Sequence, residues 1–278
     1  MDDIGGTPAD PGGWERLAPG VARRRQPFLD VTVGVVVGTD AVLVVDSGST
    51  PAEGEALRRD VGGLTGRPVT HVVLTHGHFD HVLGTAGLGA PGEHGAPVVL
   101  AAAGLTARLE HERDHGALAA DAVRHGVAPD EAAAAERALV LPDAAVADRY
   151  ALDLGGREVL LVAAGPGHTG HDLAVVVPGT PAVVFCGDLV EESGPPQAGP
   201  DAVPDAWPAA LDRLLALGGE TAVYVPGHGA VVDARFVREQ RDALAAAAAG
   251  GADGGADGGD GTDHGGGADR DGGAPGGS

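Results

Sequence analysis

Short apolar runs recur along the chain, and most contain four to eight consecutive hydrophobic residues before Gly, Pro or Asp interrupts them. Unbroken apolar strings of this length are typical of strands covered on both faces, because a half-solvated strand would alternate polar and apolar residues. We predict eight strands, at residues 29–38, 41–46, 70–75, 96–102, 157–164, 172–178, 182–187 and 221–226.

Helical patterns separate some of these strands, at residues 52–64, 105–124, 129–139, 206–217 and 234–249. Consecutive strands without an intervening helix occur at both ends of the series, which excludes a plain alternating β/α barrel. Two mixed sheets packed together, with helices outside, satisfy the pattern.

The two ends of the chain, residues 1–13 and 250–278, are low-complexity Gly, Asp, Ala and Pro segments. Such segments bury too little apolar surface to offset their ordering entropy, so we predict that both are disordered. Between them we find no linker and no internal repeat, which predicts one domain over residues 14–249.

Composition narrows the function classes. The formal net charge of −22 repels polyanions, so we expect no nucleic-acid partner. The chain shows neither an export signal nor an apolar span long enough for a membrane, and we expect no membrane partner. The single cysteine excludes an internal disulfide framework and a thiolate zinc cluster, which fits a cytoplasmic protein.

The segment "LTHGHFDH", residues 74–81, places three histidines and an aspartate within six positions directly after a predicted strand. His76 and His78 project towards the same side of an extended segment, because strand side chains repeat every two residues. Asp80 and His81 follow in the turn or the first helical residues. This density favours a metal site over a polar turn.

Further candidate ligands follow other predicted strands: His168 in "GPGHTGHD", Asp188 in "VVFCGDLV" and His228 in "VYVPGHGA". Loops that leave strand ends carry the sites of α/β proteins, and the neighbouring glycines permit tight turns. The seven ligands divide naturally into two metal shells that share one carboxylate.

The ordered set "THGHFDH", "GHT", "GD" and "PGHG" resembles the signature of the metallo-β-lactamase-fold hydrolases, HxHxDH followed by His, Asp and His. The resemblance covers roughly residues 28–245 and is nearest to the glyoxalase-II-like branch. It implies an α+β fold, a four-layer αββα sandwich of two mixed sheets with outer helices, with the site at one edge of the sheets.

The resemblance also implies the ligand assignment. One ion is expected on His76, His78 and His168, and a second on Asp80, His81 and His228, with Asp188 bridging the two. Asp80 is expected to be catalytic as well.

Two divalent ions about 3.5 to 4 Å apart can share a hydroxide whose pKa falls from about 15.7 towards about 7. This metal-bridging hydroxide predicts hydrolysis of a small-molecule substrate. Zinc is the expected ion, and iron or manganese also suits imidazole and carboxylate ligands.

The family resemblance bears on the substrate too. β-Lactamases of this fold generally lack a bridging aspartate, so Asp188 favours the thioesterase, lactonase and phosphodiesterase branches. We expect a small ester, thioester or lactone as the substrate. Glyoxalase II enzymes carry a helical glutathione-binding domain that we do not find after His228, which argues against a glutathione thioester. Two alternatives stay open: a mononuclear iron persulfide dioxygenase, and a non-enzymatic metal-binding protein of the same fold. The oligomeric state also stays open.

Some residues have competing interpretations. Asp46, at the end of "VLVVD", either orients a ligand histidine or caps the following helix. "HERDH", residues 111–115, formally fits a helical zinc motif, but it has no well-defined third ligand, although Glu131 and Glu136 lie nearby. Because its intervening residues are charged, we predict a solvated helix that belongs to a flap over the pocket.

The remaining candidates surround the predicted site. We expect no ligand role for His171 and a core position for Cys186. The Pro-rich segment 191–208 is expected to shape the pocket, and Trp207 and Phe79 either contact the substrate or lie in the core or at the rim.

Overall fold

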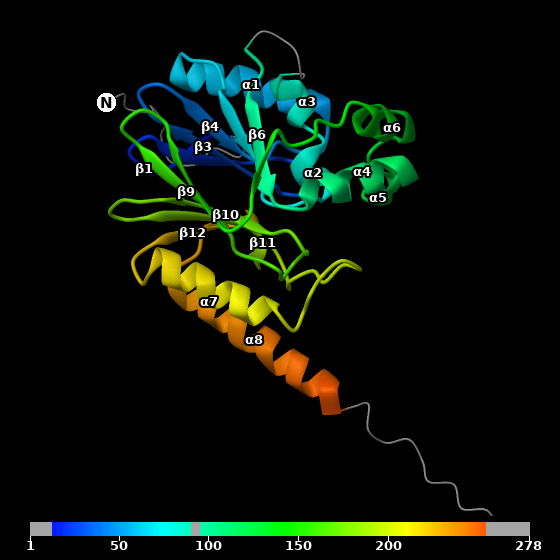
Figure 1. Ribbon diagram of the computed structural model, residues 1–278, viewed down its shortest axis with the longest axis vertical. Coiled ribbons are helices and arrows are strands. Elements are labelled where there is room, and N and C mark those ends of the chain that lie inside the picture. The colour runs from blue at the N-terminus through cyan, green and yellow to red at the C-terminus, as the bar shows by residue number, and fades with distance from the viewer. Residues whose placement is uncertain (1–12, 90–94, 254–278) are drawn as a thin grey trace, which may run out of the picture.

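Two β-sheets lie face to face at the centre of the molecule, and helices cover their outer faces (Figure 1). The computed structural model describes residues 13–89 and 95–253, and both sheets lie within them. This arrangement confirms the predicted αββα sandwich of two mixed sheets.

The first sheet has seven strands in sequence order. Its first four strands pair antiparallel, and the pairs from the fourth strand onward are parallel. The strands are β1 (Glu15–Ala18), β2 (Val21–Arg25), β3 (Thr32–Val37), β4 (Val42–Val45), β5 (His71–Val73), β6 (Val98–Ala102) and β7 (Ala144–Val146).

The second sheet has five strands in the order β12-β11-β10-β9-β8. Only the β11–β12 pair is parallel among these neighbours. The strands are β8 (Arg149–Asp153), β9 (Glu158–Ala163), β10 (Leu173–Val177), β11 (Val183–Glu191) and β12 (Val223–His228).

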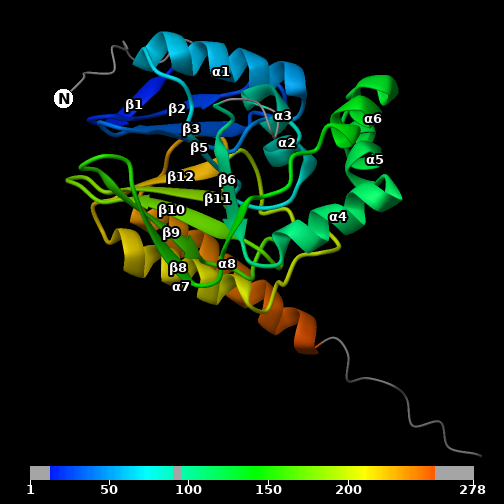
Figure 2. The ribbon, with the colours of Figure 1, turned by 45° about the horizontal axis from the view of Figure 1, so that its top comes forward.

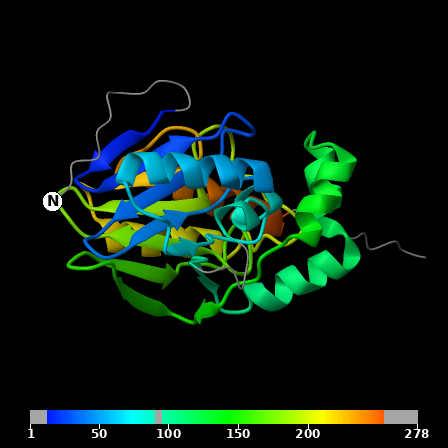
Figure 3. The ribbon, with the colours of Figure 1, turned by 90° about the horizontal axis from the view of Figure 1, so that it is seen from above.

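The helices form the outer layers and one lateral group (Figure 2). The helices on the first sheet are α1 (Pro51–Thr65), α2 (Phe79–Val82) and α3 (Thr85–Leu88). Those on the second sheet are α7 (Trp207–Gly218) and α8 (Ala234–Asp253). The lateral group, which stands beside the stacked sheets in Figure 3, contains α4 (Leu105–His115), α5 (Ala117–Arg124) and α6 (Pro129–Arg137).

Alternate residues of the buried strands belong to different cores. In β4, Val44 packs with Leu57 of α1, whereas Leu43 packs between the two sheets. In β10, Val175 lies between the sheets and Val176 faces α7 and α8. Both faces of each strand are therefore covered, which is why the sequence shows unbroken apolar runs.

The strands that the apolar pattern missed are short, polar or at an edge: β1, β2, β7 and β8. In β2 the buried Arg23 is paired with Glu15 at 2.7 Å, and the buried Arg24 is paired with Asp60. Buried charges paired in this way do not appear in a hydrophobic pattern. The short helix α3 was missed as well, and α2 was expected only as a turn or first helical residues at Asp80 and His81. The predicted helix 105–124 is divided at Gly116, whose φ of 68° ends α4.

The prediction that one strand ends at residue 187 is wrong, because β11 continues to Glu191. Its pairing with β12 shifts register on both sides of Gly187, which has a φ of 53°. The irregularity re-aims the residues that follow, as β-bulges next to sites commonly do. Asp188 therefore lies inside a strand and not in the loop after it.

Most of the two predicted disordered segments, 1–13 and 250–278, lies outside the described residues. The exception at the C-terminal side is α8, which extends to Asp253 and therefore enters the second segment. The single domain over residues 14–249 stays a prediction. Within the described residues, every helix is too short or too polar to cross a bilayer.

Candidate metal centre

The segments that carry the predicted ligands meet at one edge of the two sheets. They are the loop after β5 with helix α2, the connection between β9 and β10, the strand β11 and the end of β12. The structure brings together all seven predicted residues: His76, His78, Asp80, His81, His168, Asp188 and His228.

The local fold after β5 follows from its sequence. β5 ends at Val73, and the loop leads to His78, which has extended backbone angles (φ −73°, ψ 150°) and precedes the first turn of α2. Asp80 and His81 lie in that turn, as predicted, and are buried. Gly77 keeps the loop against α4, because a Cβ at this position would lie 2.8 Å from Leu105 Cδ1.

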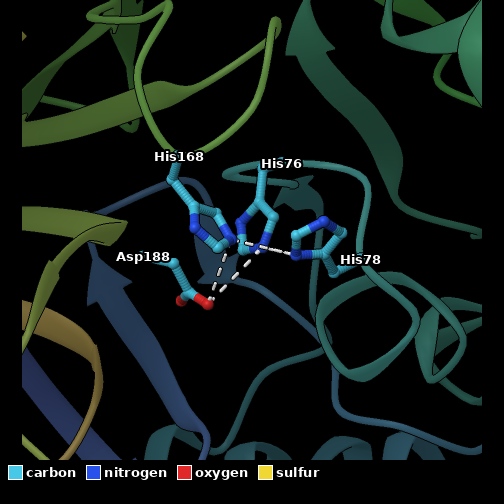
Figure 4. A group of neighbouring side chains, drawn as sticks. All are labelled: His76, His78, His168 and Asp188. Atoms are coloured by element: carbon cyan, nitrogen blue, oxygen red, sulfur yellow. Dashed lines mark hydrogen bonds and ion pairs between the residues drawn. The ribbon is translucent and has the colours of Figure 1, made fainter. Parts of the chain in front are cut away.

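The first ligand cluster contains His76, His78, His168 and Asp188 (Figure 4). His78 Nδ1 lies 3.2 Å from His76 Nε2 and 2.9 Å from His168 Nε2. Asp188 Oδ2 lies 3.7 Å from His76 Nε2 and 3.4 Å from His168 Nε2. Three imidazole nitrogens and one carboxylate oxygen thus converge on one point.

The second ligand cluster contains Asp80, His81 and His228. His228 Nε2 lies 3.3 Å from His81 Nε2 and 3.4 Å from Asp80 Oδ2. Asp80 Oδ2 is 3.7 Å from His81 Nε2.

Asp188 lies between the two clusters. Besides its contacts with the first cluster, its Oδ1 is 3.2 Å from His81 Nε2 and its Oδ2 is 3.3 Å from His228 Nε2. Glu191, which the sequence did not suggest, also offers a carboxylate oxygen close to Asp188 and His228.

The outward-facing nitrogens of the histidines have hydrogen-bond acceptors. His81 Nδ1 donates to Asp46 Oδ2 at 2.9 Å. His76 Nδ1 lies 3.0 Å from Thr75 Oγ1, and this hydroxyl donates its own proton to Asp46 at 2.8 Å. Asp46 thus orients His81, a candidate ligand; the helix-cap alternative is wrong, because Thr50 caps α1.

Backbone carbonyls fix two further rings. His168 Nδ1 donates to Gln197 O at 3.0 Å, and His228 Nδ1 donates to Leu29 O at 2.7 Å. Each bond places the proton on the nitrogen that points away from the cluster.

The outward-facing nitrogen of the fifth histidine, His78, also has a hydrogen-bond acceptor, which is a carboxylate. His78 Nε2 donates to Asp201, with 3.4 Å to each carboxylate oxygen. With every ring in its neutral form, all five inward nitrogens present lone pairs, and three of the contacts between these nitrogens span only 2.9 to 3.3 Å. Lone pairs this close need a shared electron-pair acceptor, so the donor set fits divalent cations.

The histidines of the two clusters differ in their electrostatics. Burial opposes the charge on His81 and His228, yet Asp188 raises the pKa of His81 well above its usual value and the pKa of His228 to about 9, so a cation at the second cluster has to displace their protons. Burial lowers the pKa of His168 to about 4 and holds the pKa of His76 well below its usual value, so both rings are neutral. Burial opposes the charge on Asp188, yet His81 and His228 hold its carboxyl pKa well below the usual value. Within the described residues, the buried Asp188 Oδ1 has no hydrogen-bond partner, as expected of an atom that binds a cation.

A cavity of about 860 Å³ opens above the ligands. One wall is residues 193–195 and 197–201, which confirms that the Pro-rich segment shapes the pocket. Arg108 and Glu112 of α4 and residues along the whole of α5 line the same pocket. Glu112 belongs to the "HERDH" segment, and the flap role of that segment stays a prediction.

The two aromatic candidates differ in position. Phe79 lines the pocket and stacks on His125 with ring centroids 5.4 Å apart. Trp207 is fully buried and donates from Nε1 to Leu189 O at 2.9 Å, so it belongs to the core beneath the site.

The "HERDH" alternative gains no support. Among the described residues, the groups of three or more metal-binding side chains do not include His111 or His115. His115 Nδ1 donates to His111 O at 2.7 Å, and Glu112 points to Arg108 at 2.6 Å.

Two other expectations agree with the structure. His171 belongs to none of the ligand groups and donates to Ala103 O at 3.2 Å. Cys186 is buried in the core beneath α7 and α8, where burial raises the pKa of its thiol.

The orienting residues Leu29, Gln197 and Asp201 were missed by sequence analysis. Leu29 and Gln197 act through backbone carbonyls, which no side-chain motif reports. Asp201 lies 123 positions from its partner His78, in a loop without a recognisable signature.

Comparison with known proteins agrees with the site. The sequence model of the Metallo-beta-lactamase superfamily matches residues 27–228. The chain is 31% identical over 208 residues to "Metallo-beta-lactamase domain-containing protein 1" of Xenopus laevis, covering 72% of this chain and 71% of that protein. It is 26% identical over 200 residues to a hydroxyacylglutathione hydrolase of Chromohalobacter salexigens, covering 72% of this chain and 62% of that enzyme.

Solved structures share the fold. A metallo-beta-lactamase from Pontibacter korlensis superposes with a TM-score of 0.62 at 20% identity, covering 83% of this chain and 97% of that one. The DIM-1 metallo-beta-lactamase superposes with a TM-score of 0.64 at 17% identity, covering 84% of this chain and 97% of that one. At these identities the likeness concerns architecture alone.

Proposed function

The chain belongs to the metallo-β-lactamase superfamily, and we propose that it hydrolyses small esters, thioesters or lactones with two bound divalent metal ions. The family and the ligand clusters support a metal-dependent hydrolase in general. The ester class and the use of two zinc ions are the proposal.

The position of Asp188 carries the proposal. Its carboxylate contacts ligand nitrogens of both clusters, at 3.4 Å to His168 and 3.2 Å to His81. A carboxylate shared in this way suits two adjacent cations better than one.

The ligand assignment follows the clusters. His76, His78 and His168 would hold one ion, Asp80, His81 and His228 the other, and Asp188 both. When bound, the ions supply polarisation of the scissile carbonyl and activation of water at neutral pH.

The side chains and carbonyls of the chain itself orient the histidines and place a proton acceptor in the pocket. Asp46 and the carbonyls of Gln197 and Leu29 hold three imidazoles with their lone pairs inward. Asp80 also lines the pocket, where its carboxylate is placed to accept a proton from the attacking water.

The pocket suits a small molecule with an apolar part. Leu29, Phe79 and Leu118 line it, and they offer apolar contacts for an acyl group. Its arginines are already paired, Arg108 with Glu112 at 2.6 Å and Arg124 with Asp121 at 2.7 Å, so they offer little to a nucleic-acid backbone. One relative is named a hydroxyacylglutathione hydrolase, and a hydrolytic reaction on an acyl group agrees with the proposal.

Metal analysis of natively purified protein, followed by a panel of thioesters, lactones and simple esters, tests the proposal. We expect about two zinc ions per chain and turnover of at least one substrate class. Asp188→Asn should abolish turnover, whereas Asp205→Asn, at an exposed position of the neighbouring loop, should not.

Three outcomes would contradict the proposal. Metal-replete protein that is inactive across the panel would exclude the ester class. A single bound iron together with oxygen uptake on a persulfide would favour the dioxygenase alternative. A protein that binds no metal would favour a non-enzymatic role.

A further inference from the structure

His78 is the ligand of the first cluster that packing restrains least. Its side chain is 25% exposed, compared with 1% for His76 and 4% for His168. It also presents Nδ1 to the cluster, whereas the other two present Nε2. Its ring orientation therefore depends more than theirs on the partner of its outer nitrogen.

That partner is Asp201, from the loop between β11 and α7. Both carboxylate oxygens lie 3.4 Å from His78 Nε2, so the carboxylate faces the N–H symmetrically. The Asp201 side chain is 19% exposed and lines the same pocket as His78.

A second contact joins Asp201 to helix α4. Arg108 of α4 places NH2 3.7 Å from Asp201 Oδ2, and the same guanidinium pairs with Glu112 at 2.6 Å. These three side chains line both the main pocket and a side cavity of about 220 Å³. The wall between the two cavities thus contains a chain of contacts from α4 through the loop to a ligand histidine.

We propose that Asp201 is a positioning residue that holds His78 in its ligating orientation and tautomer, so that the loop between β11 and α7, together with α4, sets the affinity of the first metal site. The inference rests on the proposed function, because it requires His78 to be a ligand. Outer partners of ligand histidines commonly change metal affinity by about 10- to 100-fold when they are removed.

Competition of the full-length protein with a chromogenic chelator tests this, using zinc as the probe and resolving the two ions. We expect Asp201→Ala to weaken the binding of one zinc ion by about 10- to 100-fold and to leave the affinity for the second ion unchanged. The zinc affinity of Asp201→Asn should lie between those of the wild type and Asp201→Ala, because its amide oxygen still accepts the hydrogen bond but carries no charge. Arg108→Gln should weaken the binding of the same ion, but by a smaller factor.

Asp205→Asn is the matched control, since Asp205 is an exposed aspartate four positions further along the same segment. Nitrogen NMR of the metal-free protein gives a second readout: Asp201→Ala should reduce the Nε2–H tautomer of His78.

Wild-type affinity in Asp201→Ala would overturn the proposal. An equal loss of affinity for both ions, together with a lowered unfolding temperature, would also overturn it, because this result would indicate general destabilisation. If the wild type itself binds no zinc, the proposed function fails as well, and that result is seen before any variant is made.

Discussion

The carboxylate of Asp46 accepts a hydrogen bond of 2.9 Å from His81 Nδ1, and it also accepts bonds of 2.8 Å from the backbone N–H and the hydroxyl of Thr75. One buried side chain thus orients a ligand of the second cluster and the loop that carries the first. Asp46 has a φ of 59°, a left-handed conformation that Asp and Asn tolerate better than most residues.

We therefore expect Asp46→Asn to keep the backbone but to weaken the hold on His81. Zinc affinity of the second cluster should fall by about 10- to 100-fold, measured by chelator competition. Asp46→Ala should in addition lower the free energy of unfolding by about 1–3 kcal/mol, because it leaves buried donors without an acceptor. Unchanged affinity in both variants would show that Asp46 has only a structural role.

Gly227→Ala should disrupt the bridging carboxylate. A Cβ at Gly227 would lie 1.8 Å from Asp188 Oδ1, so the side chain of Asp188 would have to move. We expect loss of bound metal and a fall of kcat/KM by at least about 100-fold. Gly170→Ala is the control, because no heavy atom lies within 4 Å of its Cβ position. Retention of both ions in Gly227→Ala would contradict the bridging role.

Asp172 gives a pH prediction, because burial raises the pKa of its carboxyl from 3.8 to about 7. The folded state then holds a proton that the unfolded state has lost, so the contribution to stability decreases as pH rises from about 4 to about 7. A shift of this size corresponds to about 4 kcal/mol at most.

Asp172→Asn removes the titrating group and keeps an acceptor for Thr169 N–H and Oγ1. The difference in free energy of unfolding between wild type and variant, measured by urea titration across this window, should move in favour of the variant as pH rises. A difference that is constant with pH would refute the assignment.

Two glycines of α1 should respond in opposite directions. Gly63 has no heavy atom within 4 Å of its Cβ position, whereas a Cβ at Gly54 would lie 1.8 Å from Gly84 O. We expect Gly63→Ala to stabilise the protein by about 0.5–1 kcal/mol, because alanine loses less conformational entropy in a helix. Gly54→Ala should destabilise it by about 1–3 kcal/mol or more, since α1 would be pushed from α3. Thermal unfolding of both variants checks this.

Metal removal should lower stability. A cation that binds only the folded state stabilises it by about 2.7 kcal/mol when its free concentration is 100 times the Kd. Chelation should therefore lower the Tm, zinc should restore it, and acid should release the ions because the ligands must be deprotonated. A Tm that is the same with and without zinc would mean that the clusters do not bind it.

The sequence by itself determined the layers of the fold and the seven candidate ligands. Strands buried on both faces must be apolar at every position, so Val44 and Leu43 could be assigned before their different cores were known. Ligands of a metal site must be of few residue types, and His76, His78, Asp80 and His81 lie close enough in sequence to show it.

Only the tertiary structure decided which groups orient those ligands. Asp201 and the carbonyl of Gln197 reach their histidines from a loop without periodicity, and Leu29 O reaches His228 across 199 positions. Arg24 in β2 was also beyond the sequence pattern, because its burial depends on Asp60 of α1. A sequence pattern indicates the position of a residue within its own helix or strand. These contacts form only when separate elements have packed together, and their strength depends on distances that the packing determines.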